Sequence, residues 1–197
     1  MVRTLGFHPS NRGFDPHRSH KIIYNKIMIN QKPNVLQMVI CANVFIRKDG
    51  KYLLMKRSPN KKYAPNRIHP FGGKIDKDEN PYEGAVREIK EELGINIKNL
   101  KLEAVILELT DEKDLPVNWL VFHFSADYES GEIKPNEEGE VVYLTSEEVK
   151  SSNLFPSVKS IINNILEPND GTVFTTNNYH GFESGMKQLA KNVCVVR

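Results

Sequence analysis

Three glutamates stand close together at positions 88, 91 and 92, within the stretch REIKEELGI. Residues three and four positions apart share one face of a helix, where like charges destabilise it. A solvated acidic face is one explanation for such a group. The other is a divalent cation, because closely spaced carboxylate oxygens are the hard ligands that Mg²⁺ and Mn²⁺ prefer. Since Mg²⁺ is often shared with substrate phosphates, Glu88, Glu91 and Glu92 would form a half-site that substrate completes.

Local signals predict the helix that positions these glutamates. Asn80 suits the N-cap, Pro81 suits the first helical position, and Glu83 completes the spacing of a capping box. Gly94 is a natural stop after the last helical residue. The predicted helix therefore covers residues 81–93.

One side of this helix is apolar and is predicted to pack on a sheet. At about 100° per residue, that side holds Ala85, Val86, Ile89 and Leu93. Gly84 falls in the same arc of the helix as the three glutamates. A glycine there costs about 1 kcal/mol of helix propensity relative to alanine. We expect it, together with a Gly-Gly turn at 72–73, to leave room for something to approach the backbone.

Strand patterns precede and follow the helix. Alternating or continuous apolar residues predict strands at 39–46, 51–57, 100–110, 117–128 and 141–144. Lys48 to Gly50 form a hairpin turn, and the proline-rich stretch 58–70 is expected to be a loop. Helices are predicted to open at Thr145, which Glu148 would cap, and to cover 156–166, with 182–193 as a further candidate helix.

Composition places the chain in the globular class. It has 197 residues, of which 39% are hydrophobic and 26% charged, and its net charge is +2. This balance gives no global field toward nucleic acid or anionic lipid. No apolar run is long enough to span a bilayer, and residues 1–20 lack the apolar region of a secretory signal. Cys41 and Cys194, the two cysteines, give no disulfide framework, so we expect a cytoplasmic protein with a reduced, buried Cys41.

Three segments are expected along the chain. Residues 1–34 carry six Lys/Arg and one acidic residue, and are expected to be a basic extension, either disordered or upstream of a start near Met28. Residues 35–168 would form the catalytic domain, and 169–197 would pack on it. The histidines of the extension, His8, His17 and His20, have no cysteine beside them to support a structural zinc site.

The stretch GGKIDKDENPYEGAVREIKEELGI resembles the Nudix box of the Nudix hydrolases. That pattern specifies nine positions, and this chain matches all of them: Gly73, Glu79, Arg87, Glu88, Ile89, Glu91, Glu92, Gly94 and Ile95. The resemblance implies an α/β (α+β) fold, a sandwich of helices around a mixed sheet. It also implies hydrolysis of a nucleoside diphosphate linked to another group, with Mg²⁺, or Mn²⁺, as the cofactor.

The resemblance also suggests roles for the residues of the box. Glu88, Glu91 and Glu92 would bind the metal, with a backbone carbonyl near Gly72 and Gly73. Arg87 would hold an acidic neighbour, Glu79, and orient the cluster. The general base would be Glu91, Glu92 or an acid of the loop PNEEGE, for which Glu137 and Glu138 are candidates.

The residues before the box resemble the MutT-type enzymes that clear damaged nucleoside triphosphates. Phe71 to Lys74 match their Phe-Gly-Gly-Lys, and Arg57 matches a basic position that can meet phosphate. Pro70 lies one place earlier than in the common Pro-Gly-Gly form, and His69 replaces a more usual Trp-Asn pair. His69 is thus either a base or ribose contact or a loop histidine, and Arg57, Phe71 and Lys74 are candidate substrate contacts.

Three functions are compatible with the sequence. The first is a MutT-like pyrophosphohydrolase that cleaves a nucleoside triphosphate, intact or damaged, to the monophosphate and pyrophosphate. The second is an ADP-ribose or nucleotide-sugar pyrophosphatase. The third is a nucleotide-binding regulator without activity, which would usually have lost box carboxylates, whereas this chain keeps them.

Overall fold

The computed structural model describes residues 38–196 apart from 62–63, 111–117, 136–138, 168–169 and 181–186. The extension at residues 1–34 and the loop acids Glu137 and Glu138 therefore lie outside the described residues.

Within the described part of the chain, nine strands form one mixed sheet. In chain order they are β1 (Met38–Lys48), β2 (Lys51–Arg57), β3 (Ile68–His69), β4 (Phe71–Lys74), β5 (Asn96–Thr110), β6 (Asn118–Ser130), β7 (Gly139–Leu144), β8 (Thr172–His180) and β9 (Lys187–Val196). Their order across the sheet is β3-β2-β1-β6-β5-β8-β9, while β4 pairs with β1 and β7 with β2. The β1–β6 and β5–β8 pairs are parallel and the others are antiparallel.

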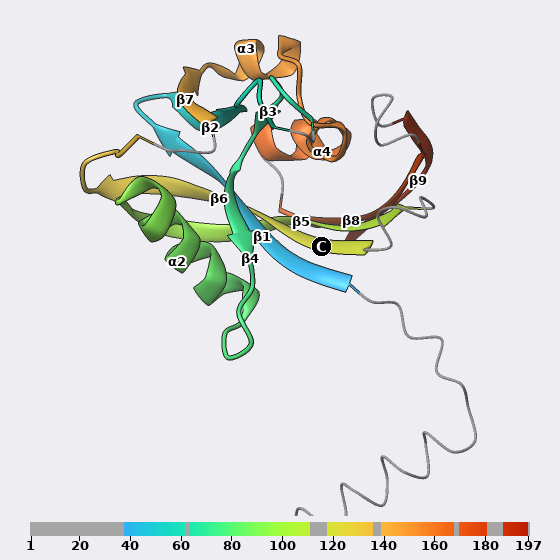
Figure 1. Cartoon of the computed structure of the whole chain (residues 1–197). Coiled ribbons are helices and arrows are strands. Elements are labelled where there is room, and N and C mark those ends of the chain that lie inside the picture. Colours follow the sequence, from blue (N-terminus) through green and yellow to red (C-terminus); the bar gives the residue numbers. More distant parts are fainter. Residues whose placement is uncertain are drawn as a thin grey trace, which may run out of the picture. The chain divides into compact units, whose positions relative to one another are not determined.

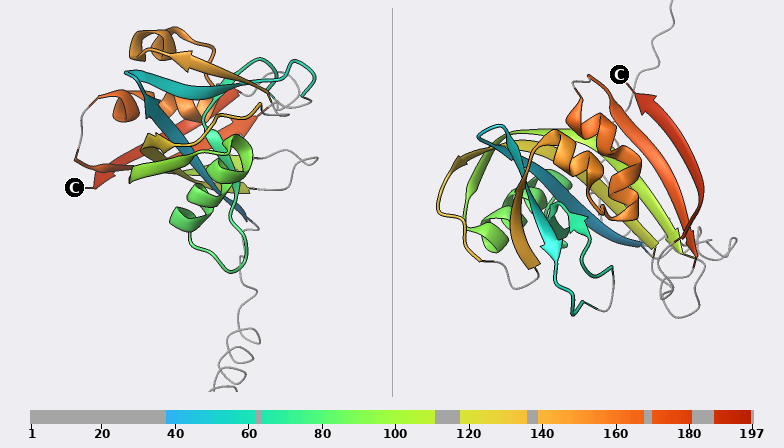
Figure 2. Two further views of the ribbon diagram at one scale, coloured as in Figure 1. Left: turned by 90° about the vertical axis from the view of Figure 1, so that its left-hand side faces the viewer. Right: turned by 90° about the horizontal axis from the view of Figure 1, so that it is seen from above.

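Helices lie on both sides of the sheet (Figures 1 and 2). Helix α2 (Pro81–Leu93) covers one side, whereas α3 (Ser146–Ser151) and α4 (Pro156–Leu166) cover the other. The expected α/β sandwich with a mixed sheet is confirmed. Among the described residues, no helix has the length and apolar character needed to cross a membrane.

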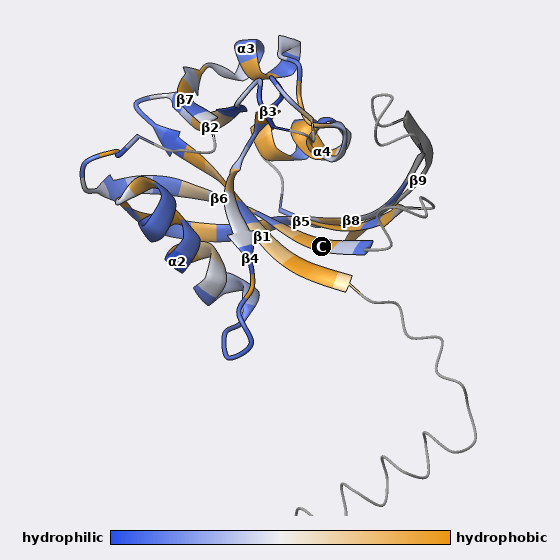
Figure 3. Ribbon diagram, viewed as in Figure 1, coloured by the Kyte–Doolittle hydropathy of each residue, from blue (hydrophilic) through white to orange (hydrophobic). Residues whose placement is uncertain are grey.

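Two apolar clusters hold these layers together. Neighbouring residues of β1 point to opposite faces, so Val44 packs under α2 and Phe45 packs under α4. The α2 cluster includes Ala85, Ile89 and Leu93 of the helix, and the α4 cluster includes its buried Val158, Ile161 and Ile165. In Figure 3 the ribbon of α2 is mostly blue, the colour of hydrophilic residues, as expected for a helix that packs on a sheet along one side only.

Several predicted elements are confirmed. Helix α2 and strand β2 have the predicted bounds, and the two later helices begin where predicted. Asp49 and Gly50 both take positive φ values, 51° and 74°, at the predicted hairpin turn.

Three predictions were wrong. A final helix was predicted at 182–193, but residues 187–196 form strand β9, which pairs with β8. The predicted loop 58–70 contains the short strand β3, because Ile68 and His69 pair with β2. Val86, predicted on the packed side of α2, is 39% exposed, whereas Gly84, predicted in the arc of the glutamates, is among the buried residues of the helix.

Candidate active site

Strand β4 brings two glycines to the base of α2. Gly72 and Gly73 pair with Asn43 and Ala42 of β1, so the expected Gly-Gly turn is a strand. Gly72 has a φ of 137°, and a Cβ there would collide with the Ala42 carbonyl oxygen. A Cβ at Gly73 would lie 2.5 Å from the carboxyl carbon of Glu88. The glycines therefore allow β1 and the Glu88 carboxylate to approach the same short strand.

The ends of α2 are fixed by its caps. Asn80 Oδ1 accepts hydrogen bonds from the Tyr82 and Glu83 amides at 2.9 and 3.1 Å. Glu83 Oε2 accepts the Asn80 amide at 3.0 Å, which completes the predicted capping box. Gly94 ends the helix in the left-handed conformation, with its amide donating to the Lys90 carbonyl. These local caps set where the three glutamates fall.

Arg87 is the hub of the site. Its Nε donates to Glu79 Oε2 at 3.0 Å, and its Nη2 donates to Glu79 Oε1 at 2.6 Å and to the Lys74 carbonyl at 3.0 Å. Its Nη1 donates to Glu88 Oε1 at 3.0 Å and to Glu91 Oε2 at 3.1 Å. One guanidinium therefore joins the loop before α2 to two of the three clustered glutamates.

Glu79 is held as an anion. The Arg87 guanidinium and the Asp76 amide lower the pKa of its carboxyl to about 2. That amide donates to Glu79 Oε1 at 2.8 Å. The Asp76 carboxylate also lies 3.8 Å from Arg87 Nε, a contact that the sequence reasoning missed. An acid three positions before Glu79, in a loop leading into a capped helix, was the available signal.

The three glutamates have different surroundings. The Glu88 side chain is 16% exposed and that of Glu91 is 60% exposed. Glu92 Oε2 instead accepts the Gly72 amide at 3.0 Å. Among the described residues, no three His, Cys, Asp or Glu side chains lie together as a complete metal site.

The donors nevertheless fit Mg²⁺ in chemical type. Carboxylate oxygens from one helix face lie beside a glycine strand that the Glu88 carboxylate contacts closely. Such a half-site suits a cation that keeps several waters and shares substrate phosphates. Glu88, Glu91 and Glu92 are the residues that would hold it.

Gly84 does not leave a vacant approach to the helix backbone. A Cβ there would lie 2.5 Å from Ile75 Cδ1 and 2.9 Å from Glu79 Oε1. The space beside Gly84 is thus filled by the chain itself. Its function is to let the Glu79 carboxylate sit against α2, where Arg87 reaches it.

The candidate substrate contacts lie in contrasting places. Phe71 is fully buried in the α2 cluster, so its ring has no surface to offer a ligand. His69 Nδ1 interacts with the Pro70 carbonyl oxygen at 2.7 Å, and its ring packs edge-on against Phe155. Burial, aided by the Arg57 charge, lowers the pKa of His69 to about 4. The Lys74 side chain is exposed.

Arg57 ends strand β2 at a small hollow. The hollow has a volume of about 400 Å³, and its lining includes Lys56, Arg57 and Asn66. Glu140 lines the same hollow, so its two basic side chains stand beside an acidic one.

A buried polar row lies on the face of the sheet under α4. Glu108 and Asn177 are neighbours across β5 and β8, and Trp119 is the neighbour of Glu108 in β6. Burial raises the pKa of Glu108 to about 7, although a hydrogen bond with the Ser157 side chain acts in the opposite direction and lowers it. Sequence reasoning missed Glu108 and Asn177, although an acid within the apolar run AVILEL was a visible signal.

His123 lies in the neighbouring part of this face. It is fully buried, and neither ring nitrogen has a hydrogen-bond partner within the described residues. Burial lowers its pKa to about 3. Sequence reasoning placed it in the predicted strand at 117–128 and gave it no role.

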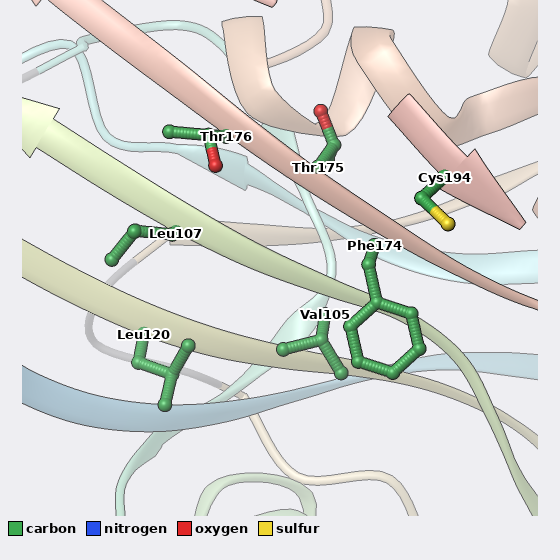
Figure 4. Close-up of a pocket in the computed structure, with 7 residues that line it drawn as sticks. All are labelled: Val105, Leu107, Leu120, Phe174, Thr175, Thr176 and Cys194. Carbon is green, nitrogen blue, oxygen red and sulfur yellow. The ribbon is translucent and has the colours of Figure 1, made fainter. Parts of the chain in front are cut away.

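A separate hollow of about 330 Å³ lies on β5, β6, β8 and β9 (Figure 4). Its lining, which includes Leu107, Leu120 and Phe174, contains no acidic or basic side chain. Its polar side-chain groups are two threonine hydroxyls and the Cys194 thiol, so its lining is mainly apolar.

Comparison with known proteins decides the family. A model of the NUDIX domain matches residues 37–164. The chain belongs to the Nudix family. It is 27% identical over 130 residues to the uncharacterized Nudix hydrolase YvcI of Bacillus subtilis, covering 64% of this chain and 78% of that protein. It is 29% identical over 127 residues to the CTP pyrophosphohydrolase of Escherichia coli, covering 62% and 87%.

The fold is shared with solved Nudix structures. A mutator MutT protein from Bacillus halodurans aligns with a TM-score of 0.67 at 22% identity, covering 79% of this chain and 97% of that one. With a Nudix domain and Nudix hydrolases among its relatives, this chain is a hydrolase that acts on pyrophosphate bonds.

Proposed function

We propose that this Nudix hydrolase cleaves a small nucleoside triphosphate to the monophosphate and pyrophosphate, with Mg²⁺ or Mn²⁺ as cofactor. The observation that carries the proposal is the Arg87 hub. It joins Glu79 to Glu88 and Glu91, while Glu92 is held by the Gly72 amide on the adjoining strand. The cytoplasmic location expected from the sequence is part of the same proposal.

The chemistry follows from what phosphate hydrolysis needs. Bound divalent cations supply charge neutralisation of phosphate oxygens and a nucleophilic water. Glu88, Glu91 and Glu92 would hold the cation, and Arg87 would keep their helix face oriented through Glu79. Glu91, Glu92 or a loop acid, Glu137 or Glu138, would accept the proton from water.

One observation favours a nucleotide with a recognised base: a relative is named a CTP pyrophosphohydrolase. Trp119, which is only partly buried, is the side chain of this chain that could stack on such a base.

A substrate panel tests the proposal. The full chain is assayed with ribo- and deoxyribonucleoside triphosphates, damaged forms of these, ADP-ribose and nucleotide sugars, each with Mg²⁺, Mn²⁺ or excess EDTA. We expect pyrophosphate and a monophosphate from a triphosphate, no turnover in EDTA, and recovery when Mg²⁺ is restored.

Release of AMP and a sugar phosphate as the dominant reaction would favour the nucleotide-sugar alternative instead. Unchanged activity in chelator would overturn the metal requirement, and nucleotide binding without turnover would favour the regulator.

A further inference from the structure

Arg87 divides its guanidinium between two sets of partners. The Nε–Nη2 edge faces Glu79 and the Lys74 carbonyl, and Nη1 faces Glu88 and Glu91. We propose that Arg87 is a built-in counter-cation: Nη1 holds Glu91 in the metal-free enzyme and releases it when a divalent cation binds, while the other edge stays on Glu79. This inference rests on the proposed metal dependence of the same site.

The Nε–Nη2 edge is built to stay in place. It makes three hydrogen bonds, of 2.6, 3.0 and 3.0 Å, two of them a fork on one carboxylate. The Glu79 side chain is only 14% exposed and is itself fixed by the Asp76 amide at 2.8 Å. A bidentate ion pair with a partly buried, independently held carboxylate is the stronger half of the Arg87 network.

The Nη1 side is built to give way at Glu91. One nitrogen serves both carboxylates, at 3.0 and 3.1 Å. Glu88 is confined, because its carboxyl carbon would lie only 2.5 Å from a Cβ at Gly73. Glu91 is 60% exposed, and an exposed ion pair at i,i+4 is weak because water screens it. Glu91 is therefore the partner that can leave.

Electrostatics gives the exchange its direction. Without a cation, the Nη1 charge offsets the repulsion between Glu88 and Glu91 and keeps both carboxylates together. A divalent cation brings twice that charge to the same hard oxygens and competes for them. The exchange of Glu91 from Arg87 to metal would assemble the ligand set only when the cation is present. In this proposal Arg87 is a positioning residue.

The test is an NMR titration of the full chain with Mg²⁺ alone, following the arginine side-chain nitrogens and the α2 amides. The Arg87 signals are assigned by their loss in Arg87→Lys. On adding Mg²⁺ we expect the Nη1 signal to shift as it loses Glu91 and keeps Glu88, while Nε–H on the Glu79 edge keeps its position. Glu91→Ala, which leaves no acceptor for Nη1 at this position and is checked for folding by its thermal midpoint, should show the shifted Nη1 signal before any Mg²⁺ is added.

The outcomes separate this inference from the proposed function. If the α2 amides shift with Mg²⁺ but Nη1 does not, the exchange is wrong and the metal site stands. If the Nε and Nη1 signals both move as one, Arg87 leaves Glu79 as well, and the division of tasks is overturned. If no α2 amide responds at saturating Mg²⁺, with or without a non-hydrolysable nucleotide, both the exchange and the metal requirement fail.

Discussion

Each of the three clustered glutamates of α2 contacts a group that offsets the repulsion from its neighbours. Arg87 Nη1 lies between Glu88 and Glu91, and Glu92 turns to the Gly72 amide. Groups of the chain therefore offset part of the negative charge of this face: one is an arginine side chain and the other is a backbone amide of the glycine strand β4. Residues kept in such an arrangement are expected to matter more for catalysis than for stability.

The glutamates give the first prediction. Glu91→Gln or Glu92→Gln removes a negative charge at nearly constant shape. Relief of i,i+3 and i,i+4 repulsion should leave the metal-free fold equally stable or more stable by about a few tenths of a kcal/mol. Turnover at saturating Mg²⁺ should nevertheless fall by about 100-fold or more, as expected for loss of a general base or a key electrostatic group. Thermal midpoints without metal and steady-state rates with Mg²⁺ measure the two effects.

Glu83→Gln is the matched control for this prediction. Glu83 lies on the same helix, but its side chain accepts the Asn80 amide in the capping box, a bond that the glutamine oxygen can also accept. Its rate should stay near wild type. Normal turnover in the Glu91 and Glu92 variants would reduce the cluster to a solvated acidic face.

The second prediction concerns His123 and acid stability. Burial lowers its pKa from the ordinary 6.5 to about 3, so the folded state holds the neutral ring while the unfolded state binds a proton below pH 6.5. Stability is thus fully present above pH 6.5 and is lost as the pH falls toward the folded pKa, by about 1.4 kcal/mol per pH unit. In His123→Phe, the loss of unfolding free energy between pH 7 and pH 5 should be smaller by about 2 kcal/mol.

Urea unfolding at pH 7 and pH 5 measures this difference, and comparison with wild type cancels the other titrating groups. His69, whose pKa falls to about 4, keeps its own contribution in both proteins. An unchanged pH dependence in His123→Phe would show that the ring is hydrated or protonated in the folded state.

At the scale of elements, local signals predicted well and long-range ones did not. The bounds of α2 followed from Asn80, Pro81 and Gly94, because a cap acts on its own first or last turn. Strand β9 depends on its pairing with β8, and such tertiary context decides between strand and helix for a short mixed segment. Val86 was misplaced because the helical stripe gives a wide arc, and only the sheet decides which part of it is covered.

The same division applies to the site. The spacing of the box predicted which acids share a face, and the resemblance supplied the Arg87–Glu79 pair. The Gly72–Glu92 bond and the close approach of Gly73 to Glu88 depend on β4 pairing with β1, which no local pattern specifies. Glu108 and Asn177 became neighbours only through the parallel β5–β8 pair.

Two glycines with positive φ give the third prediction. Gly50→Ala should lower stability by about 1 kcal/mol and leave activity unchanged, because a Cβ there meets nothing within 4 Å and only the left-handed backbone is strained. Gly72→Ala should cost more, since its Cβ would collide with the backbone of Ala42 and Asn43. It should also lower turnover, because the Gly72 amide holds Glu92.

Urea unfolding and Mg²⁺-dependent rates of the two variants, side by side, check this contrast. Equal losses of stability would mean that β4 can move away from β1 at little cost. Full activity in a folded Gly72→Ala protein would show that Glu92 does not need the amide.

In the whole molecule, the clustered glutamates of α2 lie where this helix packs on the sheet. Helix α2 packs through Ala85, Ile89 and Leu93 on a sheet whose central strand β1 also pairs with β4. The other face of β1 is covered by the α4 cluster, so the strand beneath the site is buried on both sides. Covering both faces limits the movement of Gly72 and Gly73 relative to α2, which suits a site that relies on contacts of about 3 Å.

The last prediction concerns how much of the chain this arrangement needs. We expect a chain that starts at Met28 to fold and to keep its hydrolytic rate, because residues 1–27 carry no core pattern and the matched domain begins at residue 37. Soluble yield, thermal midpoint and turnover are compared with the full chain. A chain that starts at Ala42 is the control, because it also removes Met38 to Cys41. These residues pair with β6, and Cys41 pairs with Lys74 of β4 as well. This shorter chain should lose soluble expression. If the Met28 chain loses solubility or activity as well, residues 1–27 are an integral part of the enzyme.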